Sequence, residues 1–277
     1  MTYKTIVVHC DANKKAADRL AVAADLASRF GSTLVAVHPR PPCEVPSFEV
    51  GLASAPLFDA YEKNADADQA AAHAAFDTAV KGRHLTTEWR VIDSFAEDAM
   101  ALNARYADLL IVGQADDTGI DSAPADMPES IAISTGRPVL VVPHIGTRTK
   151  PGKVVMLCWN ASRESALAAT DALPFLKAAE RVIVLIVDPQ KSSQAHGAEP
   201  GADVATWLAR HGVKVTVQRE VAADTEIGDV ILSRAADYDV DLIVMGVYGH
   251  SRMRELVLGG ASRTLLSSMT VPILIAH

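Results

Sequence analysis

The feature of this sequence that most constrains its fold is an internal repeat, because the segments of the first half recur in the same order in the second. Three pairs of apolar segments carry the match: Thr5–Asp11 with Val154–Asn160, Asp108–Gly113 with Asp241–Gly246, and Arg137–Pro143 with Val271–His277. Each copy spans roughly 135 residues, the size of an ordinary globular domain. The repeat predicts two tandem domains, at residues 1–145 and 152–277, joined by a polar linker rich in Pro and Gly.

Within each copy, short apolar runs alternate with longer segments whose apolar residues recur every three or four positions. The runs that we predict as strands are 6–9, 34–38, 86–91, 109–112 and 139–142, then 154–157, 182–187, 213–217, 242–245 and 273–275. Strands that are apolar almost throughout and separated by helices indicate a parallel sheet covered on both faces. We therefore predict an α/β fold of two doubly wound, flavodoxin-like domains, each with a five-stranded parallel sheet and helices on both faces.

Local signals place some of the helices. The spacing of apolar residues predicts a helix over Ala16–Phe30, with Gly31 as its C-cap. Ser94–Glu97 has the pattern of a capping box and predicts a helix that runs to about Tyr106. The copies differ at 39–81, where a Pro-rich loop and an Ala/Asp-rich helix form a long insertion. A lid, an oligomer contact and a surface loop without a function of its own all fit this insertion.

Composition and charge narrow the class of protein. The 277 residues carry a formal net charge of −8, so there is no basic surface to indicate nucleic acid or anionic lipid as partners. No apolar run reaches the length of a membrane span, and the beginning of the chain does not have the pattern of a signal peptide. The three cysteines are widely spaced, which argues against a disulfide framework. We expect a cytoplasmic protein.

A glycine-rich segment follows the predicted strand 242–245. Its small and polar residues include Gly246, Gly249, Arg252, Arg254, Gly259, Gly260 and Ser262. Glycines let backbone N–H groups approach an anion closely, and the N-terminus of the following helix adds free N–H groups and a positive dipole end. In a doubly wound sheet this is where ligands bind, so the segment favours a phosphate site. The other interpretation is that the glycines serve only a tight turn and a helix start.

At this segment the chain resembles the universal stress protein (UspA) superfamily, whose ATP-binding branch carries the pattern Gly-x2-Gly-x9-Gly-(Ser/Thr). Gly246, Gly249 and Gly259 match the pattern, whereas Gly260 stands where Ser or Thr is expected. The repeat and the final Val-Pro-Ile-Leu-Ile strand are also similar to this family, which has an adenine nucleotide alpha hydrolase-like fold. The resemblance covers nearly all of the chain. It implies that the second domain binds ATP, ADP or AMP, with or without Mg²⁺, in a regulatory or protective stress response.

The resemblance also implies which residues contact the nucleotide. In the family an acidic residue at the end of the first strand and the backbone at the end of the second strand take part. Asp11 and Asn160 match the former, and Val187 and Asp188 match the latter. The predicted contacts in the second domain are Asn160, Val187, Gly246, Gly249, His250, Ser251, Arg252, Gly259, Gly260, Ala261 and Ser262. Asn160 equally suits the cap of the following helix. The family pairs its final strands antiparallel between domains, which implies a pseudo-dimer within this chain and, in addition, a homodimer.

The first copy has lost the glycine pattern. Gly113 is kept, but Asp116 replaces the second glycine, and the stretch 116–126 carries four aspartates before a helix at Met127. Carboxylates there would repel a phosphate. We therefore expect a degenerate nucleotide site in the first domain, and a solvated acidic loop there rather than a cation site.

Three classes of function remain after the motif search. The first is a nucleotide-binding stress protein; the second is a stress protein without nucleotide that acts as an interaction module, which Gly260 and the degenerate first copy favour. The third is a slow ATP-hydrolysing enzyme, with His250 as its nearest acid–base group. We predict no catalytic residues, because neither a Walker loop nor a nucleophile motif occurs. We also predict no protein metal site, because no two histidines stand three or four residues apart.

Overall fold

The computed structural model describes residues 2–43, 55–115, 126–145, 150–192, 199–247 and 260–277. The elements of the first half are β1 (Thr5–His9), α1 (Ala16–Phe30), β2 (Thr33–Pro39), α2 (Ala55–Val80), β3 (Thr87–Ile92), α3 (Ala96–Ala104), β4 (Leu109–Gly113), α4 (Met127–Thr135) and β5 (Val139–Val142). Those of the second half are β6 (Val154–Cys158), α5 (Arg163–Asp171), α6 (Leu173–Ala178), β7 (Arg181–Val187), the 3₁₀ helix η1 (Pro189–Ser192), α8 (Ala202–Arg210), β8 (Val215–Glu220), α9 (Ile227–Asp237), β9 (Leu242–Gly246), α10 (Gly260–Ser268) and β10 (Ile273–Ala276).

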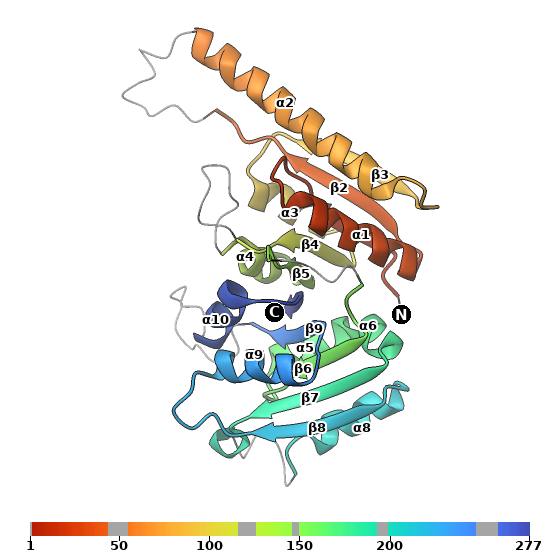
Figure 1. Cartoon of the computed structure of the whole chain (residues 1–277), viewed down its shortest axis with the longest axis vertical. Coiled ribbons are helices and arrows are strands. Elements are labelled where there is room, and N and C mark those ends of the chain that lie inside the picture. Colours follow the sequence, from red (N-terminus) through yellow and green to blue (C-terminus); the bar gives the residue numbers. More distant parts are fainter. Residues whose placement is uncertain (1, 44–54, 116–125, 146–149, 193–198, 248–259) are drawn as a thin grey trace.

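The strands form one sheet of ten, in the order β3-β2-β1-β4-β5-β10-β9-β6-β7-β8. Within each half all neighbouring strands are parallel, and the halves meet where β5 and β10 pair antiparallel, with Leu274 opposite Leu140. Figure 1 shows the two halves stacked along the long axis of the molecule. Both the doubly wound α/β prediction and the expected pairing of the final strands within the chain are confirmed. The pairing also covers two apolar strands that would otherwise be exposed sheet edges.

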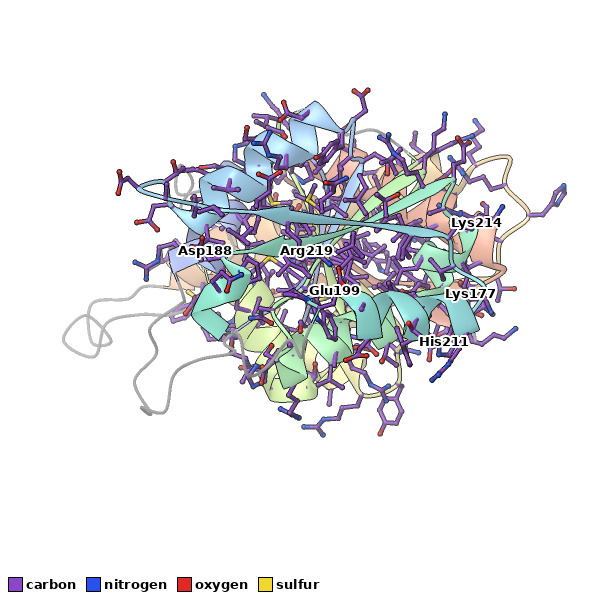
Figure 2. All side chains as sticks on the ribbon, turned by 90° about the horizontal axis from the view of Figure 1, so that it is seen from below. Lys177, Asp188, Glu199, His211, Lys214 and Arg219 are labelled. Carbon is purple, nitrogen blue, oxygen red and sulfur yellow. The ribbon has the colours of Figure 1, made fainter. Side chains whose placement is uncertain are left out.

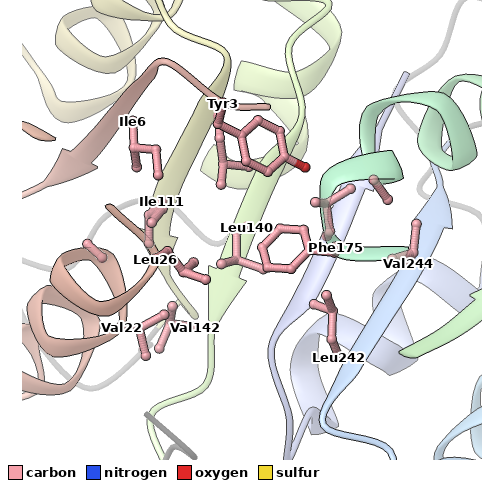
Figure 3. Packing of buried hydrophobic residues seen from close by; sticks show 14 of the residues in the cluster. Tyr3, Ile6, Val22, Leu26, Ile111, Leu140, Val142, Phe175, Leu242 and Val244 are labelled. Carbon is pink, nitrogen blue, oxygen red and sulfur yellow. The ribbon is translucent and has the colours of Figure 1, made fainter. Parts of the chain in front are cut away.

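Helices cover both faces of the sheet, and each face has its own core. One core draws on α1, α2, α5, α6 and α8, and the other on α3, α4, α9 and α10. The first core runs across the junction of the halves, where Leu140 lies beside Phe175 (Figure 3). Buried packing therefore continues from one half into the other.

Polar and aromatic contacts strengthen the same junction. The ring centroid of Tyr3 lies 5.2 Å from that of Phe30 and 5.7 Å from that of Phe175. The Tyr3 hydroxyl donates a hydrogen bond to the carbonyl oxygen of Asp171 (2.6 Å), and Arg29 Nη1 donates to the carbonyl oxygen of Pro151 (2.8 Å). These contacts join the halves into one packed body.

Most local predictions are confirmed, but one helix cap is wrong and one strand begins later than predicted. Helix α1 has the predicted bounds, and Gly31 at its C-cap has a left-handed φ of 66°. The capping box is wrong: Phe95 is the N-cap of α3 without a side-chain cap, because Glu97 accepts a hydrogen bond from the Ser130 hydroxyl instead of returning to its own helix start. β8 begins later than predicted, at Val215, because the N–H of Val213 donates to the carbonyl oxygen of Leu208 at the end of α8 instead of to a neighbouring strand.

Candidate functional site

The candidate site lies at the carboxyl ends of β6, β7 and β9. β6 stands between the other two, and the chain proceeds from it toward β8 on one side while β9 and β10 lie on the other. This reversal of direction is the switch point at which open α/β sheets bind ligands. Because the β5–β10 junction is antiparallel, the corresponding strand ends of the first half emerge at the opposite edge there.

The turn after β6 is held by its own side chains. Asn160 Oδ1 accepts a hydrogen bond from the backbone N–H of Ser162 (3.1 Å), and Ala161 between them has a left-handed φ of 60°. Ser162 is the N-cap of α5, with its hydroxyl oxygen accepting from the N–H of Ser165 (3.1 Å). Asn160 is exposed, and its amide carbonyl supports the turn before α5, whereas the cap of that helix is Ser162 and not Asn160. A strained non-glycine residue at a strand end is a common feature of ligand sites.

Gly246, at the end of β9, has a packing role that sequence alone did not reveal. A Cβ built on Gly246 would lie 2.5 Å from the backbone carbonyl carbon of Glu164 and 2.6 Å from the backbone nitrogen of Ser165. The first turn of α5 therefore presses directly onto the end of β9. Glycine is needed here for the approach of a helix, and this approach sets the position of the α5 N-terminus at the edge of the sheet.

The described part of the glycine motif ends with the start of α10. Gly260 is the first described residue of α10 and is exposed, Ala261 is half-buried, and Ser262 is 6% exposed on the inner side with Leu265. Among the described residues, the atom nearest to a Cβ built on Gly260 is Glu226 Oε2, at 3.7 Å, so these residues leave space for the Ser or Thr of the family pattern. Of the predicted contacts, Gly249, His250, Ser251, Arg252 and Gly259 lie outside the described residues.

The third strand end supplies Val187 and its neighbour Asp188. Val187 is half-buried at the end of β7. Asp188 has a left-handed φ of 51°, and its carboxylate accepts a hydrogen bond from the N–H of Ala222 (3.0 Å). The strand end is thereby tied to the loop that follows β8, which gives the edge a fixed shape.

The same place in the first half holds a buried charge network. Arg19 is 5% exposed; its Nε donates to the carbonyl oxygen of His9 (2.7 Å), and one of its terminal nitrogens lies 2.9 Å from Asp11 Oδ1. A Cβ built on Gly113 would meet the other terminal nitrogen of Arg19 at 2.6 Å. Arg19 therefore fills the space beside Gly113, which in the second half is filled by the backbone of α5.

The network keeps a definite charge state at neutral pH. Burial and the neighbouring Arg19 lower the pKa of His9 to about 4, so its ring is neutral. Burial by itself raises the pKa of Asp11, but the charge of Arg19, the neighbouring His9 and the hydrogen bonds from Arg19 and the Asn13 N–H together outweigh this and leave the pKa below its usual value. Asp11 is the residue that matches the acidic family position, and it is already neutralised by a partner inside the protein. The acidic stretch 116–125 of this half lies outside the described residues.

The cysteine beside each of the two strand ends is a weak nucleophile at neutral pH. Burial raises the pKa of the Cys10 and Cys158 thiols to about 12, so neither forms a thiolate at neutral pH. In the part of the chain that the structure describes, no three His, Cys, Asp or Glu side chains are placed to hold a metal ion. Within the same residues, no helix combines the length and the apolar character needed to cross a membrane.

Two residues of this region were missed from sequence. Arg19 is one. The sequence feature that could have identified it is a charged residue among the buried positions of α1, three residues after Ala16 and four before Ala23. Glu226 is the other, and nothing in its sequence context distinguishes it from a solvated carboxylate, because its proximity to Gly260 arises only from the packing of α9 against α10. Gly228 makes this packing close, since a Cβ there would lie 2.7 Å from Thr264 Cβ.

Comparison with known proteins places this architecture in a family. The profile of the Universal stress protein family matches residues 2–143 and again residues 152–277. A universal stress protein from Archaeoglobus fulgidus DSM 4304 is 13% identical, with 98% of this chain and 95% of that chain aligned at a TM-score of 0.72. A functionally unknown protein from Pseudomonas aeruginosa PAO1 is 15% identical, with 99% and 92% aligned at a TM-score of 0.58. No curated protein matches the chain at a significant level. The two profile matches show that the chain belongs to the universal stress protein family, as a tandem member.

Proposed function

We propose that the chain binds one adenine nucleotide, ATP or its products ADP and AMP, at the carboxyl edge of β6, β7 and β9. The binding serves a regulatory or protective role in the stress response. The observation that carries the proposal is the convergence of two helix N-termini, those of α5 and α10, on one edge of the sheet. Backbone N–H groups and aligned peptide dipoles at such ends favour phosphate groups.

The remaining parts of the site fit the same ligand. The Asn160 amide is exposed beside the α5 N-terminus, where its N–H groups can donate to a ribose or phosphate oxygen. Val187 lies one strand away and offers a half-buried backbone edge to a base. Gly249 and Gly259, from the family pattern, supply the close backbone approach that a polyphosphate needs.

The first half is proposed to act as scaffold and interface. Its acidic strand-end residue, Asp11, is held by Arg19, and this ion pair must break before Asp11 can contact a ribose. Because the halves differ in this way, binding should occur once per chain.

A second candidate is an interaction module that works without nucleotide. The observation that favours it is the carboxylate of Glu226 near Gly260, since a negative charge at the start of α10 competes with a phosphate for the same N–H groups.

Equilibrium dialysis of ATP against the intact chain separates these candidates. The nucleotide-binding proposal expects one equivalent per chain, and at least a tenfold loss of affinity in Gly249→Val and Gly259→Val, because each new side chain enters the phosphate path. Gly119→Val, in the acidic stretch of the first half, is the matched control and should bind as the parent does. The intact chain is used because separated halves would expose the Tyr3, Phe175 and β5–β10 contacts.

Two equivalents per chain, or unchanged affinity in both glycine variants, would contradict the site. Absence of binding in the parent would favour the interaction module. A phosphate-release assay on the same samples tests for hydrolysis, which we expect to be slow or absent.

A further inference from the structure

A surface hollow of about 300 Å³ lies between α5 and α8. Two indole rings line it, from Trp159 and Trp207, and its remaining walls are formed mostly by small apolar side chains. The polar side chains among its lining residues are Thr170 of α5 and Asp203, in the first turn of α8. A volume of this size is at the lower end of pockets that hold small molecules.

The hollow exists because side chains fill the space under the covering helix in the first half but not in the second. Cys10 and Trp159 occupy equivalent positions: the N–H of each donates to the neighbouring strand at 2.8 Å, to Val37 and Leu185 respectively. In the first half Cys10 is fully buried, and its sulfur lies 3.5 Å from the carbonyl oxygen of Ala72 in the long helix α2. In the second half the covering helix α8 has 9 residues instead of 26, and Trp159 is only half-buried. The space under the covering helix is therefore closely packed in the first half and open in the second.

The polar groups of the hollow accept hydrogen bonds. The Thr170 hydroxyl donates its proton to the carbonyl oxygen of Ala166 (2.9 Å), which leaves the Thr170 oxygen as an acceptor toward the hollow. Asp203 offers a carboxylate. The indole faces add negative electrostatic potential, which attracts a cation placed over the ring. Acceptors, a carboxylate and two indoles together match a ligand that carries N–H donors and positive charge.

A contact between two rings at the end of α8 supports the wall of the hollow. The ring of His211 packs against that of Trp207, with centroids 4.6 Å apart and an interplanar angle of 61°. The basic side chains Lys177 and Lys214 lie toward the His211 end of α8, whereas Asp203 stands in the first turn (Figure 2). The negative end of the hollow is thus separated from these cations by the length of the helix.

We propose that this hollow binds a small organic cation, a primary ammonium on an apolar or aromatic body. The ammonium group would contact Asp203 and Thr170, and the apolar body would lie against Trp159 and Trp207. None of the residues proposed to contact the nucleotide lines the hollow, although Trp159 directly precedes Asn160 in the chain. An anionic nucleotide is the wrong charge for it.

The test uses 2-phenylethylammonium and the neutral 2-phenylethanol, which is nearly the same size. Each is titrated into the intact chain while the three indole N–H signals are followed by two-dimensional NMR. The signals of Trp159 and Trp207 should shift and saturate, and that of Trp89 in the first half should stay. The cation should bind at least tenfold more tightly than the alcohol.

Variants assign the effect to the hollow. Asp203→Asn should bring the affinities for the two probes to within about threefold of each other, and Ala166→Leu should weaken both by filling space. Asp229→Asn, in the first turn of α9, controls for loss of a helix-start carboxylate and should bind as the parent does. The proposal is overturned if Trp159 and Trp207 do not respond, if cation and alcohol bind equally, or if Asp203→Asn keeps the preference. ATP binding, present or absent, changes none of these outcomes.

Discussion

The two halves of this molecule have the same strand order but close their strand ends by different means. In the first half a side chain does so: Arg19 reaches back from α1, fills the space beside Gly113 and neutralises Asp11. In the second half the backbone does so, since the first turn of α5 lies against Gly246 and leaves Asn160 exposed at the edge. In the first half the strand-end charges are thus paired within the protein, whereas the second half keeps polar groups available to a ligand.

The largest loss of stability is expected from a substitution at the junction where the two halves pack together. Ile273 is fully buried opposite Val141, so Ile273→Lys would bury an ammonium without a partner and cost at least about 4 kcal/mol of unfolding free energy. Because the cores are continuous, Trp89 fluorescence and that of Trp159 and Trp207 should change in a single transition during urea unfolding.

Thr216→Lys, at an exposed position on the edge strand β8, is the matched control and should change stability by less than about 0.5 kcal/mol. Two separate transitions in the parent protein would mean that the halves unfold independently, contrary to the packing seen here.

The next effect tests the buried charge network of the first half. Arg19→Met removes the cation and leaves Asp11 facing a buried region, which should cost about 3 kcal/mol. Adding Asp11→Asn, the residue type of the second half, should recover part of this loss. Arg163→Met, at the exposed start of α5, should be nearly neutral in the same urea titrations. An Arg19→Met variant as stable as the parent would show that the ion pair contributes nothing.

The two strand-end glycines allow a direct comparison. Gly246→Ala places a Cβ against backbone atoms of α5, which cannot move separately, and should cost about 2 kcal/mol. Gly113→Ala meets the end of the Arg19 side chain, which can shift, so its cost should be smaller, about 1 kcal/mol. Thermal unfolding of both variants measures the difference. Equal losses of stability in the two variants would contradict the inference that backbone closes one strand end and a side chain closes the other.

A pH effect is expected from Asp171, at the junction end of α5. Burial raises its pKa to about 6, so the folded state favours the protonated carboxyl. Its contribution to stability is therefore full below about pH 4, the unfolded pKa, and is lost as the pH rises through about 6. Since the group is only half-buried, we expect about 1 kcal/mol. Asp171→Asn should reduce the fall in stability between pH 4 and pH 7; an unchanged pH profile would contradict the assignment.

The smallest effect concerns the nucleotide proposal itself. Glu226→Gln removes the negative charge near Gly260 at the start of α10 and should tighten ATP binding by about fivefold, or about 1 kcal/mol. Glu199→Gln, whose carboxylate is paired with Arg219 on the β8 side (Figure 2), serves as the control. Equilibrium dialysis measures both. Unchanged or weaker binding in Glu226→Gln would show that this carboxylate does not compete with the phosphate.

The sequence by itself determined the architecture. The repeat, the apolar strands and the three-to-four spacing of α1 predicted two doubly wound halves, because the period of a hydrophobic pattern depends on local geometry. The antiparallel pairing of the final strands was expected only from the family resemblance.

Only the tertiary structure decided what each buried position packs against. A hydrophobic pattern says that a residue is inside, but its neighbours come from other elements, far away in sequence. Gly246 was expected to approach a phosphate, and the structure shows it against the first turn of α5. Cys10 and Trp159 occupy equivalent strand positions, yet the lengths of α2 and α8 decide that one is sealed and the other borders a hollow. The capping box failed for the same reason, since Ser130 of another helix took the Glu97 carboxylate.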